Sequence, residues 1–262
     1  MLMSNNGLRS HSPLATEGFV RFTATPGAAD FDFDASLTVL REEFASLPED
    51  PYGPGANRYR RYSRGVLLPW RRHFAWLPSR RDEDGNDIVE YFQADFNPEF
   101  ANERRRFAAL SEAARRDPLL QQLIWHDFDH TYWEDFERGL PVHVGVHFVM
   151  MMVEHDGQLA ASSPAHLHQD GEPFTFVHLI VRDNAIGAVN SIAPPKCAGL
   201  QPDEVSSALI VTQFELTEIL ESYGVNDGKV SHHVSALARG PDPGPGRRGV
   251  ILVDFTPMIP RI

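Results

Sequence analysis

Two histidines and an aspartate stand at alternate positions in AHLHQDGEPFTFVHL (residues 165–179), directly before an apolar run. In an extended strand, side chains two residues apart point to the same side, so His168 and Asp170 can reach one metal ion. A histidine from a distant strand would complete a set of two histidines and one carboxylate with three open coordination positions, which suits Fe(II) in oxygen chemistry. His166 shares a side with His168 and is a further candidate ligand.

The third ligand must come from later in the chain, where the pair His232 and His233 stands in the strand-like run VSHHVSAL. Neighbouring side chains in a strand point to opposite faces, so only one of the two can bind the metal. The run RRGVILVDF follows, and an arginine at its start, Arg247 or Arg248, could grip a dicarboxylate co-substrate through two parallel hydrogen bonds. This order of ligands and arginine is what an oxygenase that uses iron and 2-oxoglutarate requires.

Other interpretations of these histidines stay open. His168 and Asp170 can instead form a turn with a hydrogen bond, which would leave His232 an ordinary exposed histidine. His126 and His130 stand four residues apart in a helical segment, a spacing that can bind zinc. However, no glutamate directly follows His126 as metalloproteases require. The aromatic neighbours of this pair favour a packing role.

The composition limits the classes of partner. The chain has 262 residues and a formal net charge of −12, so nucleic acids and anionic membranes should repel it. The first residues lack the apolar core of a signal peptide, and no run of about 18 apolar residues could span a bilayer. The lone Cys197 can form no intramolecular disulfide, so the fold needs no oxidising compartment. We expect a cytoplasmic protein.

The segments that must position the candidate residues differ between the two halves of the chain. Residues 1–15 are polar and expected to be flexible. Apolar spacing predicts a helix over 35–47 with Asp34 as its cap, and two helices within 102–138 that are separated at Asp117 and Pro118. After Gly139, six short β-branched or aromatic runs alternate with turn segments, which is typical of an antiparallel jelly roll.

We therefore predict an α+β protein with a jelly-roll core, the double-stranded β-helix of cupin-like proteins, and helices packed on one face. Residues 16–262 would form a single domain. It would combine an N-terminal helical and lid portion (16–138) with the main sheet (139–262). The exposed edges of an open sheet make a homodimer a reasonable expectation.

Eight segments between roughly residues 45 and 256 are specific as a set because they follow one another in a fixed order: LPEDPY, RYRRYSR, YFQADFNPEF, VHVGVHF, HQDGEPFTFVHLIVRDN, TQFEL, NDGKVSHHVS and RRGVILVDF. Together they resemble the bacterial 2-oxoglutarate and Fe(II) dioxygenases related to isoleucine dioxygenase, which hydroxylate free aliphatic amino acids. The chain departs from that family at Gln169, usually an arginine, at IGAVN, usually Gly-Gly-Glu, and at FVMMM (148–152), where polar residues are usual. These changes lie near the expected pocket and bear on the substrate more than on the cofactor.

By position, the resemblance implies that His168, Asp170 and His232 bind the iron. His232 is implied rather than His233, because the distal ligand of the family follows a Val-x pair and precedes a small residue and Val. In the same register, Arg248 is implied to bind the distal carboxylate of 2-oxoglutarate, and Arg247 would point away.

The resemblance implies hydroxylation of an unactivated carbon of a free L-amino acid or close relative, with dioxygen consumed and succinate and carbon dioxide formed. Asp170 argues against halogenation, which needs the carboxylate position free for a halide. The arginine-rich segment 58–64 precedes the sheet like a lid and is a candidate to bind the substrate carboxylate, whereas we interpret His147 and His178 as core residues. Two alternatives stay open: the same chemistry on a carrier-tethered or peptidyl amino acid, and a non-catalytic jelly-roll protein that binds a metal or ligand.

Overall fold

The structure, a computed structural model, describes residues 12–25 and 31–260. Antiparallel strands make up most of its regular secondary structure, with a few helices on one side, so the predicted α+β class is confirmed. Of the segment expected to be flexible, residues 1–11 lie outside the described residues. The last residues of that segment lie in helix α2 (Pro13–Thr16). The Ser12 side chain caps this helix by accepting a hydrogen bond from the Ala15 amide.

Seven antiparallel strands form the main sheet in the order β1-β12-β8-β15-β7-β2-β3. They are β1 (Phe19–Thr23), β2 (Arg58–Leu68), β3 (His73–Trp76), β7 (Val142–Val153), β8 (Phe174–Asp183), β12 (Glu221–Asn226) and β15 (Gly246–Pro257). The prediction that the main sheet lies within residues 139–262 is therefore wrong for β1, β2 and β3. Strand β2 is no lid, because it pairs with β7 from Arg58 to Leu67.

Alternation along β7 separates the two faces of this sheet. Its even-numbered residues from Val142 to Met150 belong to the apolar core beneath the helices. Its odd-numbered residues His147, Val149 and Met151 line a pocket on the opposite, inner face. Because both faces are covered, a single step along the strand moves a side chain from the apolar core into the pocket.

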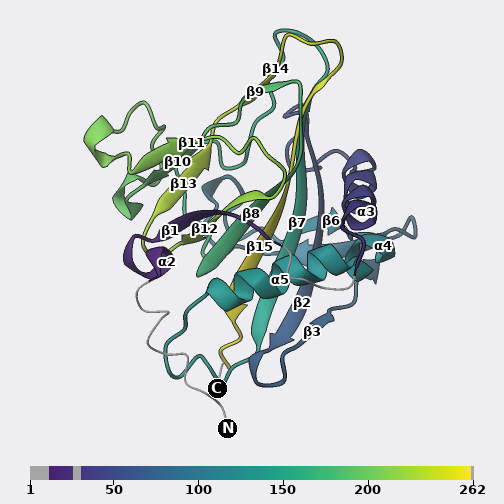
Figure 1. The fold of residues 1–262 in the computed structure, drawn as a ribbon, viewed down its shortest axis with the longest axis vertical. Helices are drawn as coiled ribbons and strands as arrows, with labels where there is room; N and C mark the ends of the chain where they lie inside the picture. Colours follow the sequence, from purple (N-terminus) through teal and green to yellow (C-terminus); the bar gives the residue numbers. More distant parts are fainter. Residues whose placement is uncertain (1–11, 26–30, 261–262) are drawn as a thin grey trace.

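The outer face is covered by helices α3 (Phe33–Ala45) and α5 (Pro118–His130), whose apolar residues pack in one core with those of the sheet. Figure 1 shows α5 lying across the strands. Helix α3 is capped by Asp32, whose carboxylate accepts from the Ala35 amide, and the predicted cap Asp34 lies in its first turn. Within the described part of the chain, no helix combines the length and the apolar character needed to cross a membrane.

The predicted pair of helices within 102–138 is confirmed for α4 (Glu112–Arg116) and α5. Asp117 separates them and caps α5, and Pro118 at the first helical position suits a helix start. The beginning of that range is different: Arg105–Ala108 forms strand β6. Its alternate residues are buried, which a helical pattern does not explain.

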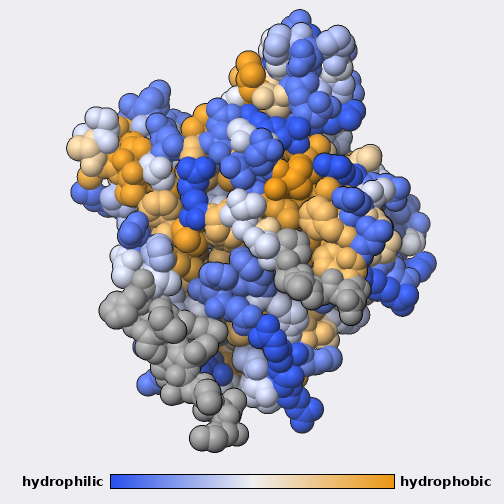
Figure 2. All heavy atoms as spheres, viewed as in Figure 1, coloured by the Kyte–Doolittle hydropathy of each residue, from blue (hydrophilic) through white to orange (hydrophobic). Residues whose placement is uncertain are grey.

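Three smaller sheets complete the fold. The minor sheet has the order β11-β10-β13, and β14-β9 and β4-β5-β6 are the others. Their strands are β4 (Arg80–Arg81), β5 (Asp87–Tyr91), β9 (Ala185–Gly187), β10 (Asn190–Ala193), β11 (Thr212–Phe214), β13 (Ser231–Val234) and β14 (Leu237–Arg239). Figure 2 shows apolar side chains on the lobe that carries the minor sheet. The pocket is lined by residues of both the main and the minor sheet and therefore lies between them.

Candidate metal centre

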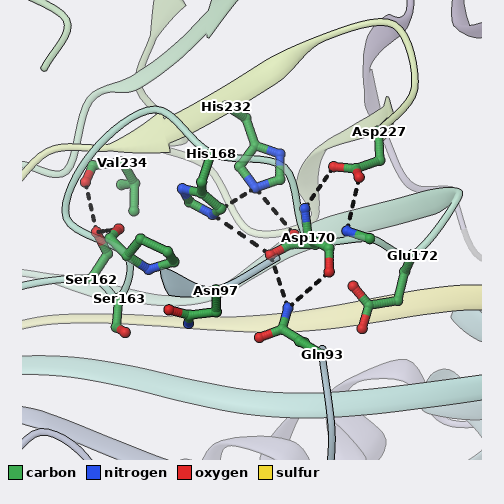
Figure 3. Close-up of polar contacts among 12 residues, drawn as sticks. Gln93, Asn97, Ser162, Ser163, His168, Asp170, Glu172, Asp227, His232 and Val234 are labelled. Carbon is green, nitrogen blue, oxygen red and sulfur yellow. Dashed lines mark hydrogen bonds and ion pairs between the residues drawn. The ribbon is translucent and has the colours of Figure 1, made fainter. Parts of the chain in front are cut away.

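His168 and His232 form a cross-strand pair. The amide of each donates a hydrogen bond to the carbonyl oxygen of the other, at 2.9 Å. Residues paired in this way place their side chains next to each other, and the two Nε2 atoms lie 3.0 Å apart. The carboxylate oxygens of Asp170 lie 3.2 Å from Nε2 of His232 and 3.7 Å from Nε2 of His168 (Figure 3). The structure thus brings together the three side chains that the sequence singled out.

Contacts from the neighbouring backbone orient this cluster. Nδ1 of His168 donates to the carbonyl oxygen of His166 at 2.8 Å, which leaves the lone pair of Nε2 free for a metal. The two carboxylate oxygens of Asp227 accept the amides of Asp170 (2.7 Å) and Gly171 (2.8 Å) and so fix the turn that presents Asp170. Gly171 adopts φ +85°, and an added Cβ would lie 2.4 Å from an aromatic ring, so this turn requires glycine.

A distant glutamine also contacts the aspartate. Gln93 Nε2 donates to the backbone oxygen of Asp170 at 3.2 Å and to Oδ1 at 3.3 Å, and Arg105 donates to the amide oxygen of Gln93. Nothing in the sequence indicated this contact, because Gln93 lies in an irregular segment 77 residues before Asp170. Asp227 was missed for a related reason, because it lies in a turn 57 residues after Asp170.

The proximity of these ionisable groups shifts their pKa values. Burial and the neighbouring His232 lower the pKa of His168 to about 4. Burial opposes ionisation of Asp170, but His232 and His168 outweigh it and hold the pKa of that carboxyl well below its usual range. Burial also opposes the charged form of His232, and Asp170 outweighs it and raises the pKa of that imidazole. A carboxylate and two imidazole nitrogens that meet at one point are a donor set suited to a divalent cation.

Arg248 lies on the inner face of β15 and lines the same pocket. It is 3% exposed, its Nε has no hydrogen-bond partner, and no ion pair involves it among the described residues. Burial lowers its pKa to about 10, although the neighbouring Tyr223 favours the charged form. An unpaired buried guanidinium is unfavourable unless a ligand supplies an anion. Alternation directs Arg247 to the other face of the strand.

The rest of the pocket has an apolar and a polar part. The apolar side chains are Val149, Met151, Val177, Val234, Val250 and Leu252. The polar part includes Arg60, Tyr91, Arg105, His147, Glu172 and Asp254. His147, predicted to be a core residue, is indeed buried but also lines the pocket. His178 is a core residue as predicted: it is fully buried on the outer face, bonded to Ser222 and Asp127.

The other sequence candidates do not join the cluster. His126 and His130 pack against the ring of Phe22, and Nδ1 of His130 donates to the carbonyl oxygen of His126. His166 contributes its carbonyl oxygen rather than its ring. Cys197 is buried in a small apolar cluster.

Comparison with known proteins agrees with this geometry. A family model described as 2OG-Fe dioxygenase matches residues 41–254. The chain is 29% identical to the 3(1)-hydroxy-L-isoleucine 4-dioxygenase of Pantoea ananatis over 233 residues, which cover 86% of this chain and 82% of that protein. It is 26% identical to the L-isoleucine-4-hydroxylase of Bacillus thuringiensis over 225 residues, which cover 85% and 84% of the two chains.

Two solved structures share the fold along nearly the whole chain. IDO from Bacillus thuringiensis superimposes with a TM-score of 0.71 at 24% identity, covering 94% of this chain and 93% of that one. A bsmA homolog from Methylobium petroleophilum gives a TM-score of 0.69 at 18% identity, covering 93% and 90%. The predicted double-stranded β-helix core is therefore confirmed.

Proposed function

The chain belongs to the 2OG-Fe dioxygenase family, and we propose that it hydroxylates an unactivated carbon of a free aliphatic L-amino acid. The enzymes of this family use Fe(II) and 2-oxoglutarate as cofactors and consume dioxygen. One observation carries the proposal: a cluster of two histidines and one carboxylate shares a pocket with a buried, unpaired arginine and an apolar wall. Such a pocket can hold a metal, a 2-oxo dicarboxylic acid and an aliphatic side chain together.

His168 and His232, through Nε2, and Asp170, through a carboxylate oxygen, would hold the iron. When bound, Fe(II) and 2-oxoglutarate activate dioxygen, so that one oxygen atom enters a C–H bond of the substrate while 2-oxoglutarate becomes succinate and carbon dioxide. The chain holds the donor atoms in place through the His166 carbonyl oxygen and Asp227. Preorganised supports of this kind fix the tautomer and the direction of metal ligands.

Arg248 would bind the distal carboxylate of 2-oxoglutarate. A guanidinium can form two parallel hydrogen bonds with a carboxylate, which a lysine cannot reproduce. The unsatisfied Nε of Arg248 and its lack of an ion pair with the described residues support this role, because the co-substrate would supply the missing partner. Tyr223 lies close enough to stabilise the arginine charge.

An aliphatic substrate suits the apolar wall of the pocket, in which Met151 is the flexible member. Both curated relatives are named for isoleucine or its hydroxylated derivative, which supports a branched aliphatic amino acid here. We further propose a cytoplasmic location, which the free, buried Cys197 supports. The homodimer stays a prediction, for which the edges β1 and β3 of the main sheet are candidates.

A mass-spectrometric screen tests this function. Purified protein with Fe(II), 2-oxoglutarate and air is offered a panel of free L-amino acids. We expect an aliphatic amino acid to gain one oxygen atom together with an equal amount of succinate. Succinate without any oxidised amino acid would indicate a tethered or peptidyl substrate instead. The absence of both products would refute oxygenase activity.

A further inference from the structure

Three ionisable side chains in the pocket lack an ion-pair partner and belong neither to the proposed iron ligands nor to the proposed co-substrate contact. They are Arg60 on β2, Arg105 on β6 and Glu172 in the loop after Asp170. Among the described residues, none of the three forms an ion pair. An unpaired charge in a buried site is unfavourable, so such groups mark where a ligand brings the opposite charge.

We propose that Glu172 binds the ammonium group, and Arg60 with Arg105 the carboxylate, of a free α-amino acid. This inference rests on the proposed function and names the groups that would recognise its substrate. It concerns the amino acid alone, because Arg248 is assigned to 2-oxoglutarate.

A chain of hydrogen bonds holds Arg60 in place. Its Nη2 donates to Nδ1 of His147 at 2.6 Å, so the proton of that ring lies on Nε2, which donates to Asp254 at 3.0 Å. Burial and the charge of Arg60 lower the pKa of His147 to about 4, which keeps the imidazole neutral. Gly145 makes room for Asp254, because a Cβ there would lie 2.1 Å from its carboxylate. The Nε of Arg60 has no partner and remains free to donate to a substrate carboxylate.

Arg105 lies beside Arg60 over the same aromatic rings. The two guanidinium carbons lie 4.9 and 5.3 Å from the ring centre of Tyr91, and 5.8 and 4.4 Å from that of Phe107. Arg105 is only 2% exposed, and burial together with the charge of Arg60 lowers its pKa. Two neighbouring cations in a pocket, one buried and one partly buried and neither paired with an anion among the described residues, form a site for one carboxylate.

Glu172 lies at the other end of Tyr91. The Tyr91 hydroxyl donates to Oε1 of Glu172 at 3.1 Å, while Oε2 is buried without a hydrogen-bond partner. Glu172 is 9% exposed. Figure 3 shows its side chain beside Asp170, on the loop that carries two of the proposed iron ligands. A carboxylate at the hydroxyl of Tyr91, next to the proposed iron ligands, and a pair of guanidiniums over the ring of the same tyrosine match the two poles of a zwitterion.

Two of the other three arginines in the segment that the sequence singled out are already paired. Arg58 forms an ion pair with Asp50 at 2.7 Å, and Arg61 forms one with Glu43 at 2.8 Å on the outer face. The fourth arginine, Arg64, is not among the residues that line the pocket, so among the described residues of this segment Arg60 alone offers the pocket an unpaired charge. A carrier-tethered or peptidyl amino acid has no free carboxylate and would leave Arg60 and Arg105 unpaired, so the arrangement favours a free amino acid.

Matched substrate analogues and variants test each contact separately. The probes are L-isoleucine, or whichever L-amino acid the screen identifies, its carboxamide, and the acid that lacks the amino group. Binding to protein loaded with Fe(II) and 2-oxoglutarate is measured by calorimetry without oxygen. For wild type we expect both analogues to bind about 10- to 100-fold more weakly than the amino acid. Glu172→Gln should remove the discrimination against the amine-free acid only, and Arg60→Gln or Arg105→Gln the discrimination against the carboxamide only.

Arg61→Gln is the matched control, since it lies next to Arg60 on the outer face and should leave the discrimination unchanged. Succinate formation in the absence of amino acid shows whether each variant keeps its metal and co-substrate site. If wild type oxidises an amino acid but the variants discriminate as wild type does, this inference is wrong and the proposed function stands. If wild type binds no free amino acid, both this inference and the proposed substrate class are wrong.

Discussion

The two faces of the main sheet treat charged residues in opposite ways. On the outer face, Arg61 is paired with Glu43, and the buried His178 is bonded to both Asp127 and Ser222. On the inner face, Arg60 and Arg248 form no ion pair with any residue that the structure describes, although Arg60 is the immediate neighbour of Arg61. Adjacent residues of the same type therefore differ only in the face to which they point.

This difference indicates on which face of the sheet a ligand binds. A buried charge that the chain itself neutralises stabilises or specifies the structure, whereas one left unpaired must be neutralised by something that binds. Natural sequences break the rules of polar satisfaction mainly at functional sites. Substitutions on the inner face should accordingly change turnover more than stability, and substitutions on the outer face should do the reverse.

The largest effect on turnover is expected at the proposed iron ligands on the inner face. His168→Ala removes one of the proposed iron ligands, and succinate formation should fall by about 100-fold or more. His166→Ala is the matched control, because only its carbonyl oxygen supports His168, and alanine keeps that oxygen. Both rates are measured at saturating Fe(II) and 2-oxoglutarate, with metal content determined in parallel. Equal losses in the two variants would place the metal elsewhere.

A feature of this site could be predicted from the sequence when the interacting residues lie close together along the chain, and not when they lie far apart. His168 and Asp170 share a face through a local rule, and the β-branched runs after Gly139 indicated the jelly roll. Strand β2 was missed because charged residues occupy both of its faces: Arg61 pairs with Glu43 of helix α3, whereas Arg58 and Arg60 line the pocket. The contact of Gln93 with Asp170 joins segments far apart in the chain, which no local periodicity reports.

The next effect concerns the co-substrate. Arg248→Ala removes the only guanidinium that we assign to 2-oxoglutarate, so the KM for 2-oxoglutarate should rise about 10- to 100-fold. Arg247→Ala alters the neighbouring residue on the other face of β15 and should leave this KM within about 2-fold of wild type. Steady-state succinate formation over a range of 2-oxoglutarate concentrations gives both values. A larger rise in the Arg247 variant would shift the register of this contact by one residue.

The smallest effect on turnover, and a clear effect on stability, is expected on the outer face. Asp127 is fully buried on α5 and accepts a hydrogen bond from Nε2 of His178 at 2.7 Å. Asp127→Asn removes the charge from the acceptor of this buried hydrogen bond and replaces the second carboxylate oxygen by an amide donor, which should lower the free energy of unfolding by about 1–3 kcal/mol. Denaturant unfolding measures this loss, while succinate formation per folded molecule should stay near that of wild type.

Asp129 on the same helix supplies the control, because it pairs with Arg72 at the surface, where both side chains are more than a third exposed. Asp129→Asn should lower the free energy of unfolding by less than about 1 kcal/mol, as is usual for a surface ion pair. If Asp127→Asn instead slowed turnover without destabilising the fold, the outer face would take part in the chemistry, and the division of roles between the two faces would be wrong.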